Sequence, residues 1–579
     1  MVTAILYNLT RVLCKSGLTI FIWFSTLTVV EERDISWIPF NAEIRKEKYD
    51  AFLVVNISAK KLYADDKISC CYSNISRDVT RHSPDHYVKI SKCLTFSNKV
   101  KITNDAIKVN CYVKKNRARK VYANTHAIAL MTDDLKRRKN KFHKANPPSV
   151  LIIGIDSVSR LNFARTLPST SNYLKQWKWI NYKAYNKVGY NTFPNIMALL
   201  TGLNLKAIKQ IADLKLNFLD VYHMIWKDFQ RLGYVTAYAE DQADMNTFTF
   251  GKKGFKDQPT DFYFRPYTLA TETMTIRKEY SLFYCAGPES YGERILNIAK
   301  DFTRTFSKQP VFGFFWMNSF SHDNVNTPMR MDDKIKLFFR TLQNNGVMNT
   351  TIIIFLSDHG IRQGKIRHTR TGWFEERLPF LHFWIPKTFR DSHKREYKNL
   401  QQNSEKLTTP YDIYMTLQHI LNLSNLNYIM KPSLSCPKCR SLFSPISSTR
   451  SCADALIDTE FCTCMFYKDF DPRHPLVLKV AKFVINETRR SMFTNSNSVT
   501  NCAVLEVGHI HYSRIAVNYP YRKKNVTYMV IQFETKPRTV LEATVRLEET
   551  EFGPQIYVEG QVHRLDLYKY TGNLADWSD

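Results

Sequence analysis

Acidic and imidazole side chains stand at the ends of several apolar stretches of this sequence, where they could bind a metal ion. Asp156 ends the first of these stretches, and His322 follows another. Asp358 and His359 follow a further stretch, and His368 lies nine residues beyond His359. Carboxylates and imidazoles suit zinc, which takes about four nitrogen or oxygen donors in proteins. A strand-end Asp alone is more often a cap and a lone His more often a core or surface residue, but several together favour a site.

A loop between two of these stretches adds a hydroxyl and a helix N-terminus. Its sequence is Asn191-Thr192-Phe193-Pro194-Asn195, and it leads into a predicted helix over Asn195–Leu200. A zinc ion beside the hydroxyl of a Ser or Thr lowers the pKa of that hydroxyl and creates a nucleophile. The first N–H groups of a helix can bind the oxygens of an anionic ester. These residue types therefore favour chemistry on an anionic ester.

The apolar stretches alternate with helical patterns along the chain. The predicted strands are Val150–Ile155, Val235–Ala239, Val311–Met317, Thr351–Leu356 and Phe380–Ile385. The predicted helices include Asn195–Leu200, Val221–Leu232, Arg294–Phe306, Asp333–Thr341 and Thr409–Leu423. Continuous apolar strands that alternate with helices predict an α/β sandwich around a mostly parallel sheet that is buried on both faces. Active sites of such sheets lie at the strand ends, where the polar residues stand.

The order and spacing of these residues resemble those of the alkaline phosphatase/sulfatase-like superfamily over roughly residues 148–425. The segment Thr192–Asn195 is similar to the nucleophile motif of the nucleotide pyrophosphatase/phosphodiesterase branch. The Ser-His and Asp-His-Gly…His layout is similar to that of phosphoethanolamine transferases. Gly154–Arg160 and Glu375–Pro379 resemble most closely an uncharacterised animal family within the superfamily. That closer resemblance covers most of the chain from about residue 50, including the late cysteines.

The resemblance implies an alkaline-phosphatase-like three-layer sandwich with a zinc site at the strand ends. The implied zinc ligands are Asp156, Thr192, Asp358 and His359. Thr192 would be the nucleophile, and Asn195 would donate a hydrogen bond to a phosphoryl oxygen. His322 and His368 would belong to a second metal site or bind the substrate phosphate.

One departure from the superfamily pattern concerns the second metal. The phosphodiesterase branch has an Asp four residues before the equivalent of His322, and this chain has Asn318 there. Asp323, Glu240 or Asp241 could replace the missing carboxylate. The sequence therefore predicts one zinc site and leaves a second one open.

The nucleophile motif also disfavours one reaction. Sulfatases make an aldehyde nucleophile from the Cys or Ser of Cys/Ser-x-Pro-x-Arg, whereas this chain has Thr192-Phe-Pro-Asn-Ile. Sulfate-ester hydrolysis by that mechanism is therefore not expected. Arg160, Arg362 and Arg370 are candidates for binding substrate oxyanions, because a guanidinium is a bidentate donor.

The composition excludes a disordered or fibrous protein, because 44% of the 579 residues are hydrophobic. Lys and Arg number 82 against 53 Asp and Glu, which gives a net charge of +29 and raises the question of nucleic-acid binding. The N-terminus carries Arg11 and Lys15 before the uncharged stretch Gly17–Val30. That stretch fits a signal peptide or a short signal anchor with a cytoplasmic N-terminus.

Cysteines and glycosylation sites agree with export. Eleven cysteines follow the leader in two main groups. A zinc ribbon in Cys436–Cys464 is an alternative, but its second pair, Cys462 and Cys464, has the wrong spacing. Disulfides explain the cysteines of an exported chain better. An odd number leaves one thiol free or paired between chains. Six Asn-x-Ser/Thr sites occur at Asn56, Asn74, Asn349, Asn422, Asn486 and Asn525. We therefore expect a glycosylated extracellular or luminal protein, either secreted or held in the membrane by its leader. Such a protein would meet glycans or lipid headgroups and no nucleic acid.

The chain divides into four predicted regions. They are the leader at 1–30, a disulfide-stapled N-terminal domain with a basic linker at 31–146, the catalytic domain at 147–435 and a cysteine-containing α+β extension at 436–579. We predict a secretory-pathway, zinc-dependent phosphoester hydrolase or phospho-group transferase with a threonine nucleophile. The alternative is a catalytically inactive superfamily member that binds a polyanion such as a glycan or lipid headgroup, since a fold does not guarantee activity.

Overall fold

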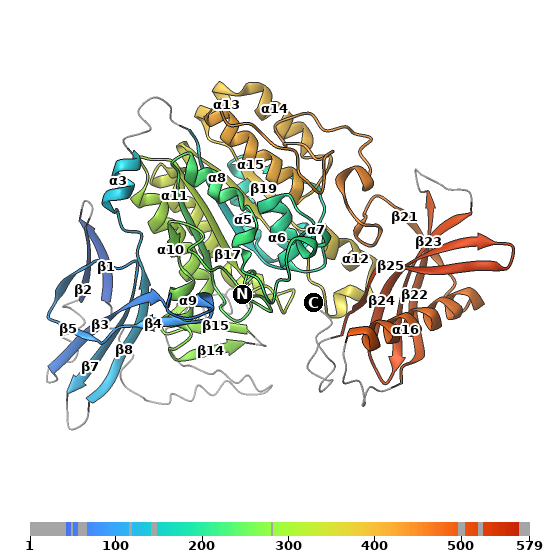
Figure 1. Ribbon diagram of the computed structural model, residues 1–579, viewed down its shortest axis with the longest axis horizontal. Coiled ribbons are helices and arrows are strands. Elements are labelled where there is room, and N and C mark those ends of the chain that lie inside the picture. The colour runs from blue at the N-terminus through green and yellow to red at the C-terminus, as the bar shows by residue number, and fades with distance from the viewer. Residues whose placement is uncertain are drawn as a thin grey trace, which may run out of the picture.

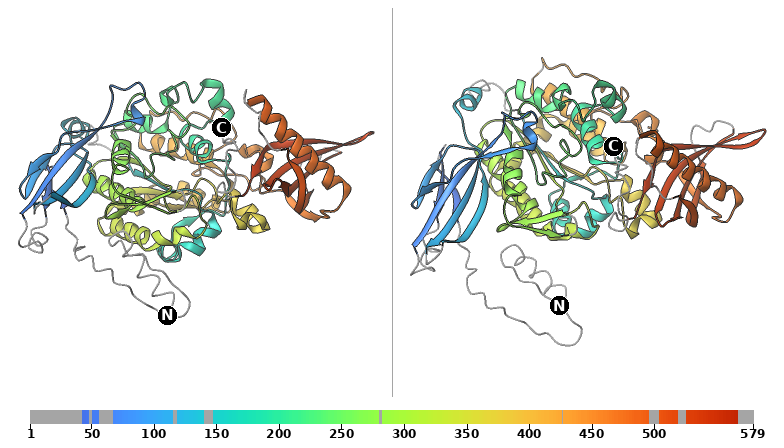
Figure 2. Two further views of the ribbon diagram at one scale, coloured as in Figure 1. Left: turned by 90° about the horizontal axis from the view of Figure 1, so that it is seen from below. Right: turned by 60° about the horizontal axis from the view of Figure 1, so that its bottom comes forward.

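The computed structural model describes residues 42–47, 50–55, 67–114, 118–139, 147–279, 282–425, 427–495, 504–518 and 525–566. The predicted leader at 1–30 lies outside these residues. Within the described residues, no helix combines the length and the apolar character needed to cross a bilayer. An α/β body lies between a β-rich N-terminal region and a second β-rich region near the C-terminus (Figure 1). Figure 2 shows these two regions at opposite ends of the molecule.

A seven-stranded sheet with the order β10-β19-β18-β9-β17-β12-β13 forms the centre of the body. Its strands are β9 (Ser149–Ile155), β10 (Ile180–Asn181), β12 (Val235–Glu240), β13 (Phe262–Tyr263), β17 (Val311–Met317), β18 (Thr351–Leu356) and β19 (Leu381–Trp384). The strands from β18 to β13 are parallel, and β19 and β10 add an antiparallel edge. The prediction of a mostly parallel sheet is confirmed.

Helices cover both faces of this sheet, because alternate residues of its strands enter two separate hydrophobic cores. Leu151 and Ile153 of β9 belong to one core, and Val150 and Ile152 belong to the other. The first core includes residues of α4 (Arg160–Thr166), α5 (Pro168–Gln176), α9 (Arg265–Thr271), α10 (Tyr291–Thr305) and α11 (Asp332–Asn344). The second includes residues of α6 (Thr192–Thr201), α7 (Leu205–Ile211), α8 (Ile225–Arg231), α13 (Lys387–Ser392), α14 (Lys394–Asn403) and α15 (Pro410–Ser424). The predicted three-layer sandwich is therefore confirmed.

The N-terminal region consists of small antiparallel sheets, and strand β3 of one of them carries two disulfides. Its strands are β1 (Ala42–Glu47), β2 (Asp50–Val55), β3 (Lys67–Arg77), β4 (Val88–Ile90), β5 (Leu94–Phe96), β6 (Lys99–Ile102), β7 (Ala106–Lys114) and β8 (Ala118–Ala127). The disulfides Cys70–Cys111 and Cys71–Cys93 confirm the predicted staples. The basic run predicted as a linker begins as helix α3 (Asp133–Lys139), because Arg138 pairs with Asp134 and with Asp261 of the body.

The C-terminal extension is an antiparallel sheet with one helix on it. Its strands are β21 (Phe466–Phe470), β22 (Glu506–Asn518), β23 (Val526–Lys536), β24 (Val540–Thr550) and β25 (Gly553–Arg564). Helix α16 (Pro475–Asn495) shares a hydrophobic core with this sheet. The segment before it carries the disulfides Cys436–Cys439 and Cys452–Cys462, so these cysteines form disulfides as predicted. Among the described cysteines, Cys464 has a free thiol.

Candidate metal centre and cavity

Three buried side chains meet where β9 and β18 end. Asp156 follows β9, and Asp358 and His359 follow β18, its neighbour in the sheet. One ligand atom from each lies within 4.8 Å of the other two. His359 Nε2 is 3.2 Å from Asp358 Oδ2 and 3.7 Å from Asp156 Oδ1. Two carboxylates and an imidazole at this spacing could hold a metal ion.

Hydrogen bonds to one atom of Asp358 and to one atom of His359 orient these side chains, and the other potential ligand atom of each has no hydrogen-bond partner. Asp358 Oδ1 accepts the backbone N–H of His359 at 2.9 Å and that of Ser157 at 3.2 Å. His359 Nδ1 is 2.9 Å from the Gly360 carbonyl oxygen, to which it donates, so Nε2 keeps its lone pair. Asp358 Oδ2 and His359 Nε2 are fully buried and have no hydrogen-bond partner. Buried polar atoms are normally satisfied, so these two fit a bound cation.

The electrostatics of the group point the same way. Burial raises the pKa of Asp156 well above its usual value, and the charge of Asp358 raises it further. Burial lowers the pKa of His359 to about 4, which outweighs the opposite effect of Asp358, so the imidazole is neutral at pH 7. The neutral imidazole is the state that a divalent cation requires, and a cation would offset the repulsion between the two carboxylates that raises the pKa of Asp156.

Two backbone features at the strand ends, at Ser157 and Gly360, position this cluster. Ser157, directly after Asp156, has a φ of 62°, a left-handed conformation that non-glycine residues rarely adopt. Its hydroxyl donates to Asp156 Oδ1 at 2.8 Å. After His359, a Cβ on Gly360 would lie 2.1 Å from the carbonyl oxygen of Glu375, so only glycine allows α12 (Arg370–Arg377) to approach this closely. The Asp-His-Gly sequence therefore combines two potential metal ligands with a glycine that the packing of α12 requires.

A cavity of about 1030 Å³ opens beside the cluster. Asp156 and Thr192 line it together with His322 and Arg362. Thr192 is the first residue of α6, and the preceding Asn191 is its N-cap. The structure therefore brings the predicted nucleophile to the same cavity as a predicted metal ligand.

Arg362 joins two loops at the edge of this cavity. Its guanidinium donates to Asn191 Oδ1 and, at 3.0 Å, to His322 Nε2. His322 Nδ1 donates to Asp323 Oδ1 at 2.8 Å. Both nitrogens of His322 are thus engaged, and a guanidinium stands beside the imidazole that was predicted for a second metal or for the substrate phosphate. The substrate-oxyanion role considered for Arg362 agrees with its place in the cavity wall.

The carboxylates considered as replacements for a second metal site are also engaged. Glu240 Oε1 accepts hydrogen bonds from Asn318 Nδ2 at 2.8 Å and from the Thr247 N–H at 2.9 Å. Asp241 accepts the backbone N–H groups of Asn318 and Ser319 at 2.8 and 3.1 Å. Both residues tie the end of β12 to the end of β17.

Asn195 holds the loop of residues 188–191 that precedes Thr192. Its Oδ1 accepts the N–H groups of Val188 and Gly189 at 2.8 and 3.2 Å. Its Nδ2 donates to the carbonyl oxygens of Gly189 and Asn191 at 2.9 and 2.8 Å. Both amide hydrogens are used by the loop, so the predicted hydrogen bond to a phosphoryl oxygen would replace one of these bonds.

Two other predicted site residues lie away from the cavity wall. His368 Nδ1 is 2.9 Å from Oε1 of Gln532 on β23, and its ring faces His511. Arg160 is the first residue of α4 and acts electrostatically on His382 of β19. Neither residue lines the cavity or belongs to the metal cluster.

Sequence reasoning missed the contribution of the C-terminal extension. Part of the cavity wall comes from five residues of this extension: Asp458, Glu460, Phe461 and, from β25, Gln561 and Arg564. Tyr190, beside the nucleophile loop, stacks on His563 of β25 with ring centroids 4.3 Å apart. The five wall residues lie more than 260 positions after Thr192, and no motif links them to it, so only the folded chain reveals them.

Comparisons with known proteins identify a family. A model described as "Protein of unknown function (DUF229)" matches residues 35–511. No curated protein matches the sequence significantly.

Several solved structures are similar to this chain at low identity. A protein in the alkaline phosphatase superfamily from Vibrio parahaemolyticus is 13% identical, with a TM-score of 0.37, and the match covers 74% of this chain and 91% of that one. The phosphonate monoester hydrolase from Silicibacter pomeroyi is 11% identical, with a TM-score of 0.38 and coverages of 70% and 90%. The lipoteichoic acid synthase LtaP from Listeria monocytogenes is 12% identical, with a TM-score of 0.33 and coverages of 51% and 79%.

Proposed function

The chain belongs to the DUF229 family, and from that premise and the cavity geometry we propose that it is a zinc-dependent phosphoester hydrolase or phospho-group transferase. One observation carries the proposal. Two buried ligand atoms without partners, Asp358 Oδ2 and His359 Nε2, converge with Asp156 beside a cavity that also holds Thr192. A purely structural role explains neither the open lone pairs nor the hydroxyl at a helix N-terminus next to them.

The proposed reaction uses Thr192 as the nucleophile. Asp156, Asp358, His359 and Thr192 would hold the zinc ion, which when bound lowers the pKa of the threonine hydroxyl and polarises the ester. Thr192 Oγ1 would form a bond to phosphorus while the bond to the leaving alcohol breaks, which gives a phosphothreonine. Water or a second alcohol would then take the phospho-group from Thr192. Arg362 would bind the non-bridging oxygens of the ester, since its guanidinium faces the cavity.

The proposal includes an exported protein. The described cysteines form disulfides in both predicted groups, which is typical of an oxidising compartment. Among the predicted glycosylation sites, Asn349, Asn486 and Asn525 have exposed positions. A secreted or membrane-anchored form, with glycans on these residues, would meet anionic esters outside the cytosol.

The test is an activity panel on the full chain purified from a secretory host. We expect the chain to hydrolyse bis(p-nitrophenyl) phosphate or p-nitrophenyl phosphate and to leave p-nitrophenyl sulfate intact. Thr192→Ala should abolish this activity, and Thr192→Ser should retain part of it. Thr201→Ala is the matched control, because Thr201 ends the same helix and its hydroxyl donates to the Met197 carbonyl oxygen. Full activity of Thr192→Ala would refute the proposed nucleophile.

A further inference from the structure

One end of the cavity has the composition of an anion-binding subsite. It is formed by residues 204–215 and 245–252, and we call it the lysine end. Its cavity-lining side chains include four lysines and one carboxylate: Lys206, Lys209, Lys215, Lys252 and Asp213. The metal centre uses none of these residues. The same segments supply apolar wall, including Leu205, Leu214 and Phe250.

The lysines of α7 are available to a ligand. Lys206 and Lys209 lie three residues apart, which places them on one side of the helix. Both are exposed, and no ion pair with a described residue holds either of them. The carboxylate of Asp213 accepts the backbone N–H groups of Lys215 and Leu216 at 2.7 and 3.2 Å, so it caps its own turn.

One residue of the lysine end, Lys252, lies close to the residue that follows Thr192. Lys252 Nζ lies 4.5 Å from the ring centroid of Phe193, the residue after Thr192. The cavity that contains Thr192, Lys206 and Lys209 has a volume of about 1030 Å³. This is much more space than a simple phosphoester fills, so a ligand that fills the cavity carries further groups.

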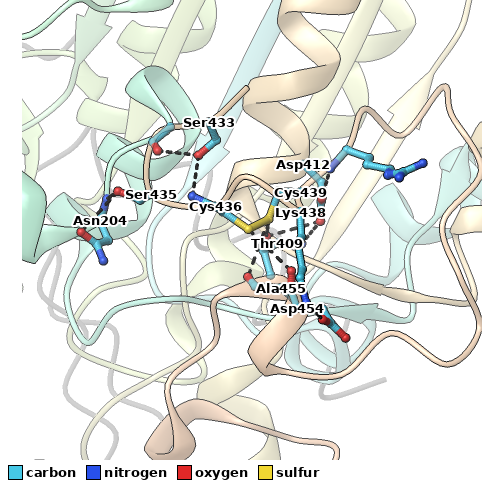
Figure 3. The surroundings of a disulfide bond; sticks show 12 residues. Asn204, Thr409, Asp412, Ser433, Ser435, Cys436, Lys438, Cys439, Asp454 and Ala455 are labelled. Atoms are coloured by element: carbon cyan, nitrogen blue, oxygen red, sulfur yellow. Dashed lines mark hydrogen bonds and ion pairs between the residues drawn. A yellow bond between two sulfur atoms is a disulfide. The ribbon is translucent and has the colours of Figure 1, made fainter. Parts of the chain in front are cut away.

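The scaffold fixes the lysine helix in place. Asn204, the N-cap of α7, accepts the N–H of Ala207 at 2.9 Å, and its own N–H donates to Ser435 Oγ at 2.9 Å. Ser435 precedes Cys436, which forms the Cys436–Cys439 disulfide, and Figure 3 shows Asn204 and Ser435 side by side near it. Ser433 Oγ donates to the carbonyl oxygen of Gly202, where α6 ends. The link from α6 to α7 is thus held by a disulfide-closed turn, and a preorganised site loses less entropy on binding.

We propose that the lysine end binds a second anionic group of the substrate, so that the substrate is an ester carried on a linear polyanion. This inference rests on the proposed function for the reacting ester and adds the class of molecule that carries it. The lysines line a concave cavity beside apolar wall, a shape that suits a chain of anionic sugar units entering lengthwise. Because Lys206 and Lys209 are exposed, an anionic lipid surface is the alternative that the test must distinguish.

The test measures binding separately from turnover. Isothermal titration calorimetry on the full chain uses a sulfated hexasaccharide as the probe, with the desulfated hexasaccharide as the neutral probe. We expect the sulfated probe to bind, with an affinity that falls as salt rises, and the desulfated probe not to bind. Lys206→Gln combined with Lys209→Gln should weaken binding of the sulfated probe roughly tenfold or more, because each lost charge-assisted contact contributes substantially. Activity on bis(p-nitrophenyl) phosphate should stay unchanged in this variant.

A matched variant controls for total charge. Lys394→Gln with Lys398→Gln removes two exposed lysines from one side of α14, outside the cavity, and should bind the probe like the wild type. Equal binding by the α7 variant and the wild type would overturn the proposal, as would no binding by the wild type. Binding only to vesicles of phosphatidylcholine and phosphatidylserine would also overturn it, in favour of a membrane surface. Failure of the proposed function would appear instead in the Thr192→Ala assay.

Discussion

Two buried clusters of charged residues lie within the same protein and differ in how they are neutralised. The metal cluster of Asp156, Asp358 and His359 gathers two carboxylates around a neutral imidazole. The second cluster, which we call the ion network, joins the body to the C-terminal sheet and consists of Lys187, Arg367, Glu376, Arg377 and Glu542. All of these side chains are buried, yet only the metal cluster contains carboxylate and imidazole atoms without partners.

Each carboxylate of the ion network is paired with two buried cations. Glu542 Oε1 accepts from Arg367 at 3.0 Å and from Arg377 at 3.3 Å, and Tyr512 donates to Glu542 Oε2 at 2.8 Å. Glu376 pairs with Lys187 and Arg377. Burial alone does not therefore mark a reactive site in this protein. Carboxylate and imidazole atoms without partners indicate a candidate site, whereas carboxylates that are each paired with two buried cations indicate a structural junction.

The largest effect on activity should follow from removing one ligand of the proposed metal site. Asp358→Asn keeps Oδ1 for the N–H groups of Ser157 and His359 but removes a negative charge from the metal. We expect phosphoesterase activity to fall at least about 1000-fold, because the metal contributes several kcal/mol to the reaction. Without metal, the free energy of unfolding should stay equal or rise by about 1 kcal/mol, because the repulsion with Asp156 is relieved. A variant that keeps its activity would contradict the assignment.

The opposite pattern should follow when the ion network loses a carboxylate. Glu542→Gln leaves Arg367 and Arg377 buried without their shared anion, so the free energy of unfolding should fall by about 3–5 kcal/mol in urea titrations. Metal content should not change. Asp391→Asn removes an exposed pair with Lys387 and serves as the control, with an expected loss below about 1 kcal/mol. An equal effect of both substitutions would show that the network is not a buried junction.

Acid should weaken the ion network in a defined pH window. Burial alone would raise the pKa of Glu542, but Arg367 and Arg377 outweigh it and lower the pKa to about 2 from an ordinary value of 4.5. A depressed carboxyl pKa stabilises the folded state above pH 4.5, and this contribution of about 3 kcal/mol is lost as the pH falls from 4.5 towards 2. Unfolding curves across this window should therefore be less pH-dependent for Glu542→Gln. Curves of equal steepness for both proteins would count against this pairing.

The smallest effect should come from substituting Arg362, and it would show whether this arginine belongs to the reactive site. Arg362→Gln should lower kcat/KM about tenfold through loss of a bidentate contact to the ester, with little change in stability. Arg370→Gln is the matched control, because Arg370 does not line the cavity. Steady-state kinetics on bis(p-nitrophenyl) phosphate measure both variants. Identical kinetics of the two would remove Arg362 from the site.

The fold was predictable because its strands are long and continuously apolar. Val311–Met317 and Thr351–Leu356 coincide with β17 and β18, and strand ends in a parallel sheet meet at one edge. For that reason Asp156, Asp358 and His359 could be placed together from sequence. Their distances depend on details that no pattern reveals, such as the left-handed backbone at Ser157.

The rest of the site depends on contacts between distant segments. The resemblance assigns His368 to a second metal site or to the substrate phosphate, whereas in the structure its Nδ1 lies 2.9 Å from Oε1 of Gln532 in the C-terminal sheet. Asn195 was expected to face the substrate, but the turn at Val188–Asn191 takes all its hydrogen bonds. The lysine end and the wall from β25 arise only when segments far apart in sequence fold together.

The proposed function requires the buried trio to bind one catalytic metal ion. The most direct test is the metal content of the purified wild type and of Asp358→Asn, measured side by side by inductively coupled plasma mass spectrometry after dialysis against metal-free buffer. We expect about one equivalent of zinc in the wild type and almost none in the variant, because the site would keep too few of its roughly four ligands. A wild type without bound metal, or a variant that binds as much as the wild type, would contradict it.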